Sequence, residues 1–277
     1  MNDLSNAGER GLPPSAATSL ADRLVYLKHQ TMYAWTHRWT RGRQVLDLGC
    51  GEGYGSHNLA EVASSVVAAD YSPAAARHVL ATYGSPRLRG VCCDGERLLF
   101  AAESFDVVVS FEVIEHVPDV ACYLRDVQRV LRSGGAFLVS SPNRLTRPQL
   151  LQRPWNPHHL REYTAEQYDQ ALRRVFPQVE VYGVTAIPEI GEIERKRVRR
   201  AALRSWSTRL ARGVLPVAVY STLKMRLKAW RRPVLAGNQT VDASSRLADV
   251  GRFTAADFSI TNKNLDGSMN LVAVCIR

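Results

Sequence analysis

Short apolar runs alternate with amphipathic stretches along most of the chain. Aliphatic and β-branched residues run together where buried strands are expected. These places are residues 44–48, 66–70, 88–92, 105–110, 136–140, 179–184 and 270–276. Apolar residues at helical spacing predict helices at residues 20–39, 120–131 and 164–176, and further helices follow the first two strands. The alternation predicts an α/β fold, a doubly wound and mostly parallel sheet with helices on both faces.

Local signals agree with these helix ends. Pro73 stands where a helix tolerates a residue without an N–H, so it opens the helix after the second strand. Thr164 and Gln167 form a capping-box pattern that starts a helix, and Pro177 ends that helix. The run Ser133-Gly-Gly stops the helix over residues 120–131.

The regular alternation of predicted strands and helices is interrupted once, between residues 188 and 256. We therefore expect residues 20–187 to form the core domain with an N-terminal helix, and residues 257–277 to complete its sheet. Residues 188–256 are expected to be a basic helical insertion or lid. Residues 1–19 are polar and contain Gly and Pro, which favours a flexible arm.

The net charge of +10 is concentrated in that insertion. Residues 195–232 contain thirteen Lys or Arg and no Asp or Glu, and the other residues include 23 basic and 26 acidic ones, a net charge of −3. Two helices are predicted here, separated near Gly213 and Pro216, and the second has an apolar face with Trp230 beside a basic face. Such a helix suits peripheral contact with an anionic membrane. It suits equally a solvated lid over the substrate. Binding of RNA or another polyanion is a third possibility for this segment.

Composition limits the class of protein. A hydrophobic content of 45% can support a full core, and no apolar run is long enough to span a membrane. The N-terminus lacks the charged start and apolar core of a secretory signal. Five cysteines without Cys-x-x-Cys spacing indicate reduced thiols in the cytoplasm and no metal site. We expect a cytoplasmic protein with peripheral membrane contact through residues 195–232, and the oligomeric state stays open.

The strongest functional signal is the run Val45-Leu-Asp-Leu-Gly-Cys-Gly-Glu-Gly-Tyr-Gly. A buried strand leads directly into Gly49, Gly51 and Gly53, where a backbone without Cβ can turn sharply and approach a ligand. The dinucleotide pattern Gly-x-Gly-x-x-Gly fails from either of the first two glycines. Glu52 would repel a pyrophosphate, but it suits a ligand with an amino group and a sulfonium.

Two carboxylates follow the next strands. Asp70 ends the second strand, 21 residues after Gly49, where a carboxylate can accept both hydroxyl groups of a ribose. Asp94 and Gly95 follow the third strand, where a carboxylate can accept the amino group of an adenine. Alone, an Asp at a strand end is often an ordinary turn or cap residue. Together with the glycine loop, this spacing indicates an adenosyl ligand.

The glycine run resembles motif I of the class I S-adenosylmethionine-dependent methyltransferases. The segments Cys93-Asp-Gly, Ser104-Phe-Asp-Val-Val-Val-Ser-Phe-Glu-Val-Ile-Glu-His-Val and Leu131-Arg-Ser-Gly-Gly-Ala-Phe-Leu-Val are similar to its later motifs, in order. The resemblance covers residues 41–187 and the last strand. It implies that S-adenosylmethionine is the cofactor and is bound by Asp47, Gly49, Gly51, Gly53, Asp70, Tyr71, Asp94, Gly95, Phe111 and Glu112.

Methyl transfer from a sulfonium is an in-line displacement, so the protein chiefly has to align the acceptor. A hydroxyl acceptor also needs a general base. His116 follows the fourth strand at its carboxyl end, where the acceptor should lie, and it is a candidate base. Its alternative role is structural, orienting the loop through Glu112 or Glu115.

A second group of candidates lies in the loop Asn156-Pro-His-His-Leu-Arg-Glu-Tyr-Thr. His159 is a second candidate base, and His158, Arg161 and Glu162 are candidate substrate contacts. The alternative reading is a solvated loop with a helix cap. The loop resembles an Asn-Pro-x-His-x-Arg-Glu signature of family members near bacterial glycan and glycolipid biosynthesis.

Three functions remain open at this point. The leading candidate is O-methylation of a sugar, glycan or glycolipid hydroxyl. A quinone-type or other small aromatic or lipid acceptor is second, because the ubiquinone and menaquinone methyltransferases share the same core. A non-catalytic subunit that binds the cofactor is third. A nucleic-acid acceptor is not favoured, since Phe111-Glu-Val-Ile stands where base-methylating enzymes carry Asn/Asp-Pro-Pro-aromatic.

Overall fold

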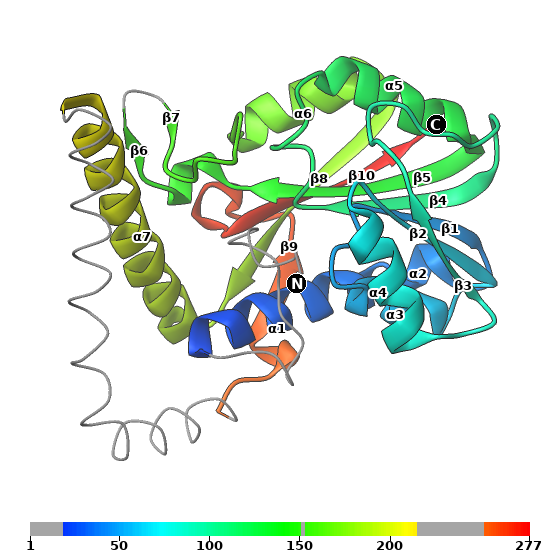
Figure 1. The fold of residues 1–277 in the computed structure, drawn as a ribbon, viewed down its shortest axis with the longest axis horizontal. Coiled ribbons are helices and arrows are strands. Elements are labelled where there is room, and N and C mark those ends of the chain that lie inside the picture. The colour runs from blue at the N-terminus through cyan, green and yellow to red at the C-terminus, as the bar shows by residue number, and fades with distance from the viewer. Residues whose placement is uncertain (1–18, 151–152, 215–251) are drawn as a thin grey trace.

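The computed structural model describes residues 19–150, 153–214 and 252–277, and their centre is an eight-stranded sheet (Figure 1). Its strand order is β3-β2-β1-β4-β5-β10-β8-β9. The strands are β1 (Gln44–Leu48), β2 (Ser65–Asp70), β3 (Leu88–Cys92), β4 (Phe105–Phe111), β5 (Leu131–Pro142), β8 (Gln178–Ala186), β9 (Phe258–Thr261) and β10 (Asn270–Ile276). The first five strands pair in parallel, while β10 runs antiparallel between β5 and β8. The prediction of a mostly parallel sheet is confirmed.

The strand order reverses beside β1, which pairs with β2 on one side and with β4 on the other. The connection from β1 to β2 and the connection from β4 to β5 therefore run in opposite directions from this point. In open α/β sheets, such a reversal leaves a crevice outside the carboxyl ends of the strands, and ligands bind there. The glycine loop after β1 and the loop after β4 both lie at this crevice.

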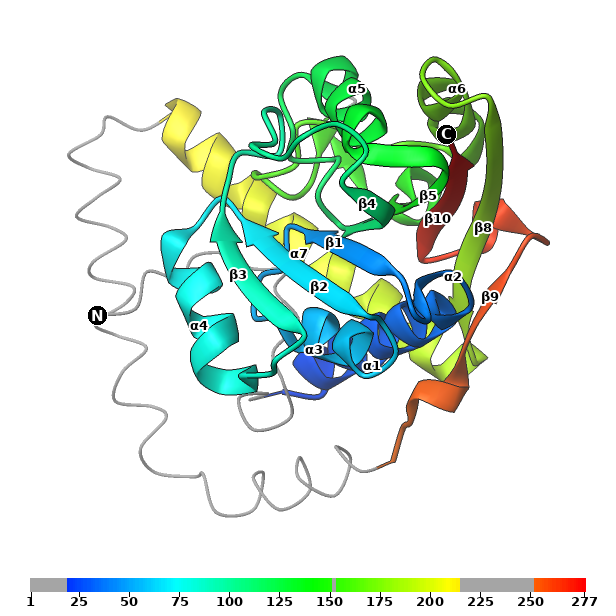
Figure 2. The same cartoon turned by 90° about the vertical axis from the view of Figure 1, so that its right-hand side faces the viewer.

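Helices cover both faces of the sheet, as Figure 2 shows from the edge of β3. The helices are α1 (Leu20–Trp35), α2 (His37–Thr40), α3 (Tyr54–Ala60), α4 (Pro73–Tyr83), α5 (Val120–Val130), α6 (Ala165–Arg173) and α7 (Pro188–Val214). One buried cluster joins α5 and α6 to the sheet, and another joins α1, α3 and α4 to the opposite face. Within β4, Val108 enters the first cluster while Val107 and Val109 enter the second, because successive strand residues point to opposite faces.

Several elements differ from the expected ones. The helix expected over residues 20–39 breaks at Thr36, whose hydroxyl donates to the backbone oxygen of Tyr33. The helix expected to reach residue 131 ends at Val130, because Leu131 already pairs with Phe105 as the first residue of β5. The edge strand β9 was not expected from the sequence.

The expected insertion begins as one long helix, α7, which stands beside the hairpin of β6 (Gln149–Leu150) and β7 (Arg153–Pro154) (Figure 1). Val198 and Ala202 pack on Trp155, and Glu194 lies 3.6 Å from the guanidinium of Arg147. The second basic helix and the N-terminal arm lie outside the described residues. Within the described ranges, no helix is both long and apolar enough to cross a membrane.

Candidate functional site

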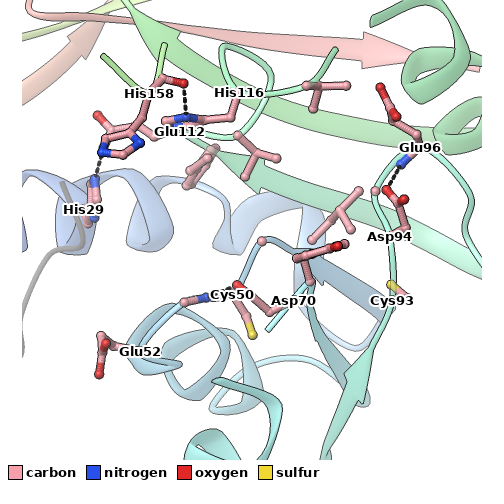
Figure 3. Close-up of a pocket in the computed structure, with 18 of the residues that line it drawn as sticks. His29, Cys50, Glu52, Asp70, Cys93, Asp94, Glu96, Glu112, His116 and His158 are labelled. Atoms are coloured by element: carbon pink, nitrogen blue, oxygen red, sulfur yellow. Dashed lines mark hydrogen bonds and ion pairs between the residues drawn. The ribbon is translucent and has the colours of Figure 1, made fainter. Parts of the chain in front are cut away.

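A pocket of about 630 Å³ opens where the strand order reverses (Figure 3). Its wall is formed by the loops that follow β1, β2, β3 and β4, by helix α1, and by the loop of residues 155–163. Figure 3 shows Asp70 and Asp94 together on one side, with Glu112, His116 and His158 on another. The carboxylates that the sequence predicted to meet a ligand are therefore brought into one cavity.

The glycine loop depends on the absence of side chains at two positions. Gly49 has a φ of 81°, and a Cβ there would lie 2.3 Å from a methyl group of Val113. Gly53 has a φ of 80°, and a Cβ there would lie 2.4 Å from a methyl group of Val79. Both values of φ lie in the left-handed region that favours glycine. Glycine at these positions therefore lets the loop pack closely against Val113 in the loop after β4 and against Val79 in α4. Gly49 and Gly51 line the pocket.

Asp70 connects the glycine loop to the end of β2. Its Oδ2 accepts a hydrogen bond from the backbone N–H of Gly51 at 3.0 Å, and its Oδ1 accepts one from Ser72 at 2.8 Å. The carboxylate lines the pocket. Because each carboxylate oxygen has two lone-pair positions, Asp70 retains acceptor capacity toward the pocket after these two bonds.

The second carboxylate, Asp94, and its neighbours complete this side. Asp94 accepts a hydrogen bond from the backbone N–H of Glu96 at 2.9 Å and lines the pocket with Gly95. Tyr71 also lines the pocket, and its side chain is 79% exposed. Burial raises the pKa of the Cys93 thiol to about 11, so that thiol stays protonated and unreactive at neutral pH.

Asp47 does not line the pocket, although the resemblance implied a cofactor contact. Its side chain is fully buried beneath the glycine loop, where it accepts hydrogen bonds from the hydroxyl groups of Ser56 and Tyr33. Burial raises its pKa to about 6, against the lowering effect of those two bonds. Asp47 supports the loop from below. Gly53 likewise does not line the pocket; it is the N-cap of α3.

Glu112 follows β4 and is held by side chains from distant parts of the chain. Its Oε1 accepts hydrogen bonds from Lys28 at 2.5 Å and from Asn270 at 2.6 Å, while its Oε2 pairs with Nε2 of His29 at 2.8 Å. The second ring nitrogen of His29 contacts the hydroxyl group of Tyr54. We call these five residues the Glu112 network.

The Glu112 network is buried and ionic. Burial alone would raise the pKa of Glu112, but the charges and hydrogen bonds of Lys28 and His29 hold it well below its ordinary value. Sequence reasoning missed Lys28, His29, Tyr54 and Asn270 as members of the site. A signal existed, because Lys28 and His29 interrupt the apolar stripe of α1 at positions that helical spacing turns toward the core.

The other side of the pocket is built around His116. The Nδ1 of His116 donates to the backbone oxygen of His158 at 3.0 Å, and the side chain of Asn156 accepts the backbone N–H of His158 at 3.0 Å. All three residues line the pocket. The structure thus brings together His116 and His158, which the sequence had placed on separate loops.

His159, Arg161 and Glu162 do not line the pocket, which corrects the expectation that they face an acceptor. The side chain of His159 is 0% exposed, and its Nδ1 pairs with Glu162 at 2.8 Å. The guanidinium of Arg161 donates to the backbone oxygens of Val117 and Pro118 at 2.7 and 2.9 Å. These residues fasten their loop to the loop after β4. Of the predicted contacts in this loop, only His158 lines the pocket.

Known proteins resemble this chain along its whole length. A family described as a methyltransferase domain matches residues 46–139, from within β1 to within β5. A probable S-adenosylmethionine-dependent methyltransferase of Mycolicibacterium smegmatis is 32% identical over 283 residues, covering 98% of this chain and 94% of that protein. The chain belongs to the S-adenosylmethionine-dependent methyltransferases. The cofactor of this methyltransferase is S-adenosylmethionine, as its sequence indicated.

Two further likenesses are narrower. The crystal structure of the [4+2]-cyclase SpnF superposes on the methyltransferase with a TM-score of 0.55 and 16% identity, covering 91% of this chain and 81% of that one. At this identity the likeness shows a common fold. A ubiquinone biosynthesis O-methyltransferase of Rhizobium johnstonii is 35% identical over 131 residues, 44% of the methyltransferase and 52% of that protein.

Proposed function

We propose that this methyltransferase methylates a hydroxyl group of a sugar, glycan or glycolipid. The observation that carries the proposal is a single pocket with two chemically different sides. One side holds the glycine loop and two carboxylates, which suit an adenosyl ligand. The other side holds imidazole rings and the amide of Asn156, which suit a polar acceptor that must lose a proton.

The first side fits the cofactor. The backbone of Gly49 and Gly51 would hold the amino-acid part, Asp70 would accept the ribose hydroxyl groups, and Asp94 would accept the adenine amino group. The close approach of Gly49 to Val113, which excludes a Cβ, supports this fit because it keeps backbone at the pocket surface. When bound, the cofactor supplies an electrophilic methyl group on a sulfonium.

The second side provides a candidate base. Because Nδ1 of His116 donates to a carbonyl oxygen, the neutral ring carries its lone pair on Nε2. That nitrogen is the atom that would take the proton of an acceptor hydroxyl. His158 and Asn156 border the same side and would orient the acceptor. General-base assistance of this kind contributes roughly 10²- to 10⁴-fold to a rate.

A quinone-type acceptor is the second candidate. The partial likeness to a ubiquinone biosynthesis O-methyltransferase favours it, since it spans 44% of this chain. The exposed ring of Tyr71 at the pocket would suit an aromatic ligand as well as an adenine. Both candidates are hydroxyl methylations, so they share the role given to His116 and differ in the acceptor.

Incubation with methyl-labelled cofactor tests the proposal. The purified chain and a His116→Asn variant would each be incubated with bacterial glycan, glycolipid and quinone fractions and with RNA. We expect label in the glycan or glycolipid fraction, lost in the variant while cofactor binding persists. Label confined to the quinone fraction would favour the second candidate. Label in RNA alone, or none anywhere despite cofactor binding, would overturn the hydroxyl proposal.

A further inference from the structure

Three side chains of metal-binding type meet beside the acceptor side of the pocket. Glu115 and His116 belong to the loop after β4, and His159 belongs to the loop of residues 155–163. Each offers one ligand atom, and these atoms all lie within 4.8 Å of one another. Glu115 is fully buried, whereas His116 lines the pocket. Two imidazoles and a carboxylate form a ligand set that proteins use for zinc.

Hydrogen bonds orient both imidazole rings. Nδ1 of His116 donates to the backbone oxygen of His158 at 3.0 Å, and Nδ1 of His159 donates to Oε1 of Glu162 at 2.8 Å. Nδ1 thus carries the proton in each neutral ring, and Nε2 carries the lone pair. Histidines that bind metals almost always donate their other N–H to a carbonyl or carboxylate. Both rings already have the tautomer that a metal ligand needs.

Backbone hydrogen bonds fix the two loops relative to each other. The backbone oxygen of Glu115 accepts the N–H groups of Leu160 and Arg161 at 2.9 and 3.4 Å. The guanidinium of Arg161 holds the backbone oxygens of Val117 and Pro118. Their acceptors, Glu115, Val117 and Pro118, stand before and after His116 in the chain. The three ligands can therefore close on an ion with little loop movement, which favours tight binding.

The neighbouring carboxylate, Glu112, does not belong to this cluster. Its two oxygens accept hydrogen bonds from Lys28, His29 and Asn270. The two glutamates of this loop thus have different roles. Glu112 binds α1 and β10, and Glu115 faces the two histidines.

We propose that Glu115, His116 and His159 bind one divalent ion of the zinc type, with an open coordination position toward the pocket. Imidazole nitrogens favour zinc and its neighbours over magnesium or calcium, which prefer oxygen ligands. The role of the ion rests on the proposed function: the acceptor hydroxyl would fill the open position. The ion would lower the pKa of that hydroxyl, and its proton would pass to solvent. His116 is then a metal ligand, and the ion replaces it as the group that ionises the acceptor.

Metal titration of the tag-free full-length chain tests the site without any acceptor. After dialysis against a chelator, the chain would be titrated with CoCl₂ while visible absorption is recorded, and with ZnCl₂ by calorimetry. We expect one site per chain and the d–d bands of a low-coordinate cobalt ion. A His116→Ala variant, altered at the pocket surface, and a His159→Ala variant should each bind on the order of a hundredfold more weakly or not at all.

Two further variants sharpen the test. His158→Ala keeps the backbone oxygen that orients His116, so it should bind the ion as the wild type does. Glu162→Gln should weaken binding about ten- to hundredfold, the usual cost of losing an outer carboxylate partner. Circular dichroism checks that each variant is folded. Absence of cobalt bands in the wild type, or equal affinity in the wild type, His116→Ala and His159→Ala, would overturn the site.

Turnover after chelation separates the site from the proposed function. If the ion ionises the acceptor, the chelated chain loses methyl transfer and recovers it with ZnCl₂. Unchanged turnover after chelation would reject the catalytic role of the ion and return His116 to the role of base. A failure to label any sugar would reject the acceptor, yet the cobalt titration would still decide whether the metal site exists.

Discussion

Asp70 offers the sharpest single-residue test of the cofactor side. An Asn in its place keeps the shape but removes the charge and one acceptor oxygen. Hydrogen bonds to charged groups contribute about 1.5–3 kcal/mol, so we expect Asp70→Asn to weaken S-adenosylmethionine binding about ten- to hundredfold. Calorimetric titration measures this directly. Asp169→Asn is the matched control, because Asp169 pairs with Arg173 on the surface of α6. Equal affinity in the wild type and both variants would remove Asp70 from the cofactor site.

The raised pKa of Asp47 leads to a prediction about the stability of the fold. Its pKa in the folded chain is about 6, above the ordinary 3.8. The folded state therefore holds this proton more tightly than the unfolded state between those two pH values. The resulting stabilisation is complete below about pH 4 and is lost as the pH rises through 6.

We therefore expect Asp47→Asn to remove this pH dependence. Between pH 4 and pH 7, the free energy of unfolding of the variant should rise relative to the wild type by on the order of 3 kcal/mol. Urea denaturation at several pH values measures the difference. Asp22→Asn, at the start of α1, is the control for removing a carboxylate outside this buried site. A constant difference between Asp47→Asn and the wild type across this range would contradict the shift.

For single residues, the sequence predicted where a functional residue lies in the fold better than the direction in which its side chain points. Asp70 and Asp94 could be located because they end strands whose carboxyl ends must meet at one crevice. His159 could not be oriented, because its burial depends on Glu162 and on a loop contact between Arg161 and Val117, which lie 44 residues apart in the chain. The partners of Glu112 lie 83 to 158 residues from it in the chain, a separation that no local pattern reports.

At the scale of elements, α1 closes the pocket through a buried ion pair. Lys28 and Glu112 meet at 2.5 Å, with side chains 7% and 10% exposed. Removing one partner of such a pair leaves an uncompensated charge, which costs about 3–5 kcal/mol. We expect Lys28→Met to lower the free energy of unfolding by that amount, measured by urea denaturation.

The matched control for this prediction lies on α7. Lys196 pairs with Glu192 at 2.7 Å, but both side chains are more than half exposed. Solvent screens such pairs, so Lys196→Met should change stability by about 0.5 kcal/mol or less. Combining Lys28→Met with Glu112→Gln should recover part of the loss, since no unpaired charge remains. A loss for Lys28→Met no larger than that of the control would contradict a buried pair.

Elements with strong periodicity were predicted well, and those defined by tertiary contacts were not. The capping box at Thr164 and the opening Pro73 were correct, because both are local chemistry. The edge strand β9 has four residues, too few for an alternating pattern to stand out. It exists because it pairs with β8, about 75 residues earlier in the chain. The end of α5 was likewise decided by strand pairing.

At the scale of the whole molecule, charge is divided between the core and the segment after it. The formal net charge is +10, yet outside residues 195–232 it is −3. The described part of that segment belongs to α7, where Arg195, Lys196, Arg199, Arg200 and Arg204 are exposed. Packing of Val198 and Ala202 on Trp155 fixes the buried face of this helix. The basic face is therefore directed away from the body of the protein, where an anionic surface could reach it.

Vesicle binding tests whether this charge recruits the protein to membranes. Each Lys or Arg near an anionic surface contributes about 1 kcal/mol. Replacing Arg195, Arg199, Arg200 and Arg204 by Gln should thus weaken binding to mixed phosphatidylserine–phosphatidylcholine vesicles on the order of a hundred- to thousandfold. Co-sedimentation measures this, with pure phosphatidylcholine vesicles as the neutral control and circular dichroism as the check that α7 remains folded. High salt should reproduce the loss in the unmodified chain, because exposed charges are screened within about 10 Å at 0.1 M. Equal pelleting with charged and neutral vesicles would show that the basic face of α7 serves another purpose, such as solvating a cover over the pocket.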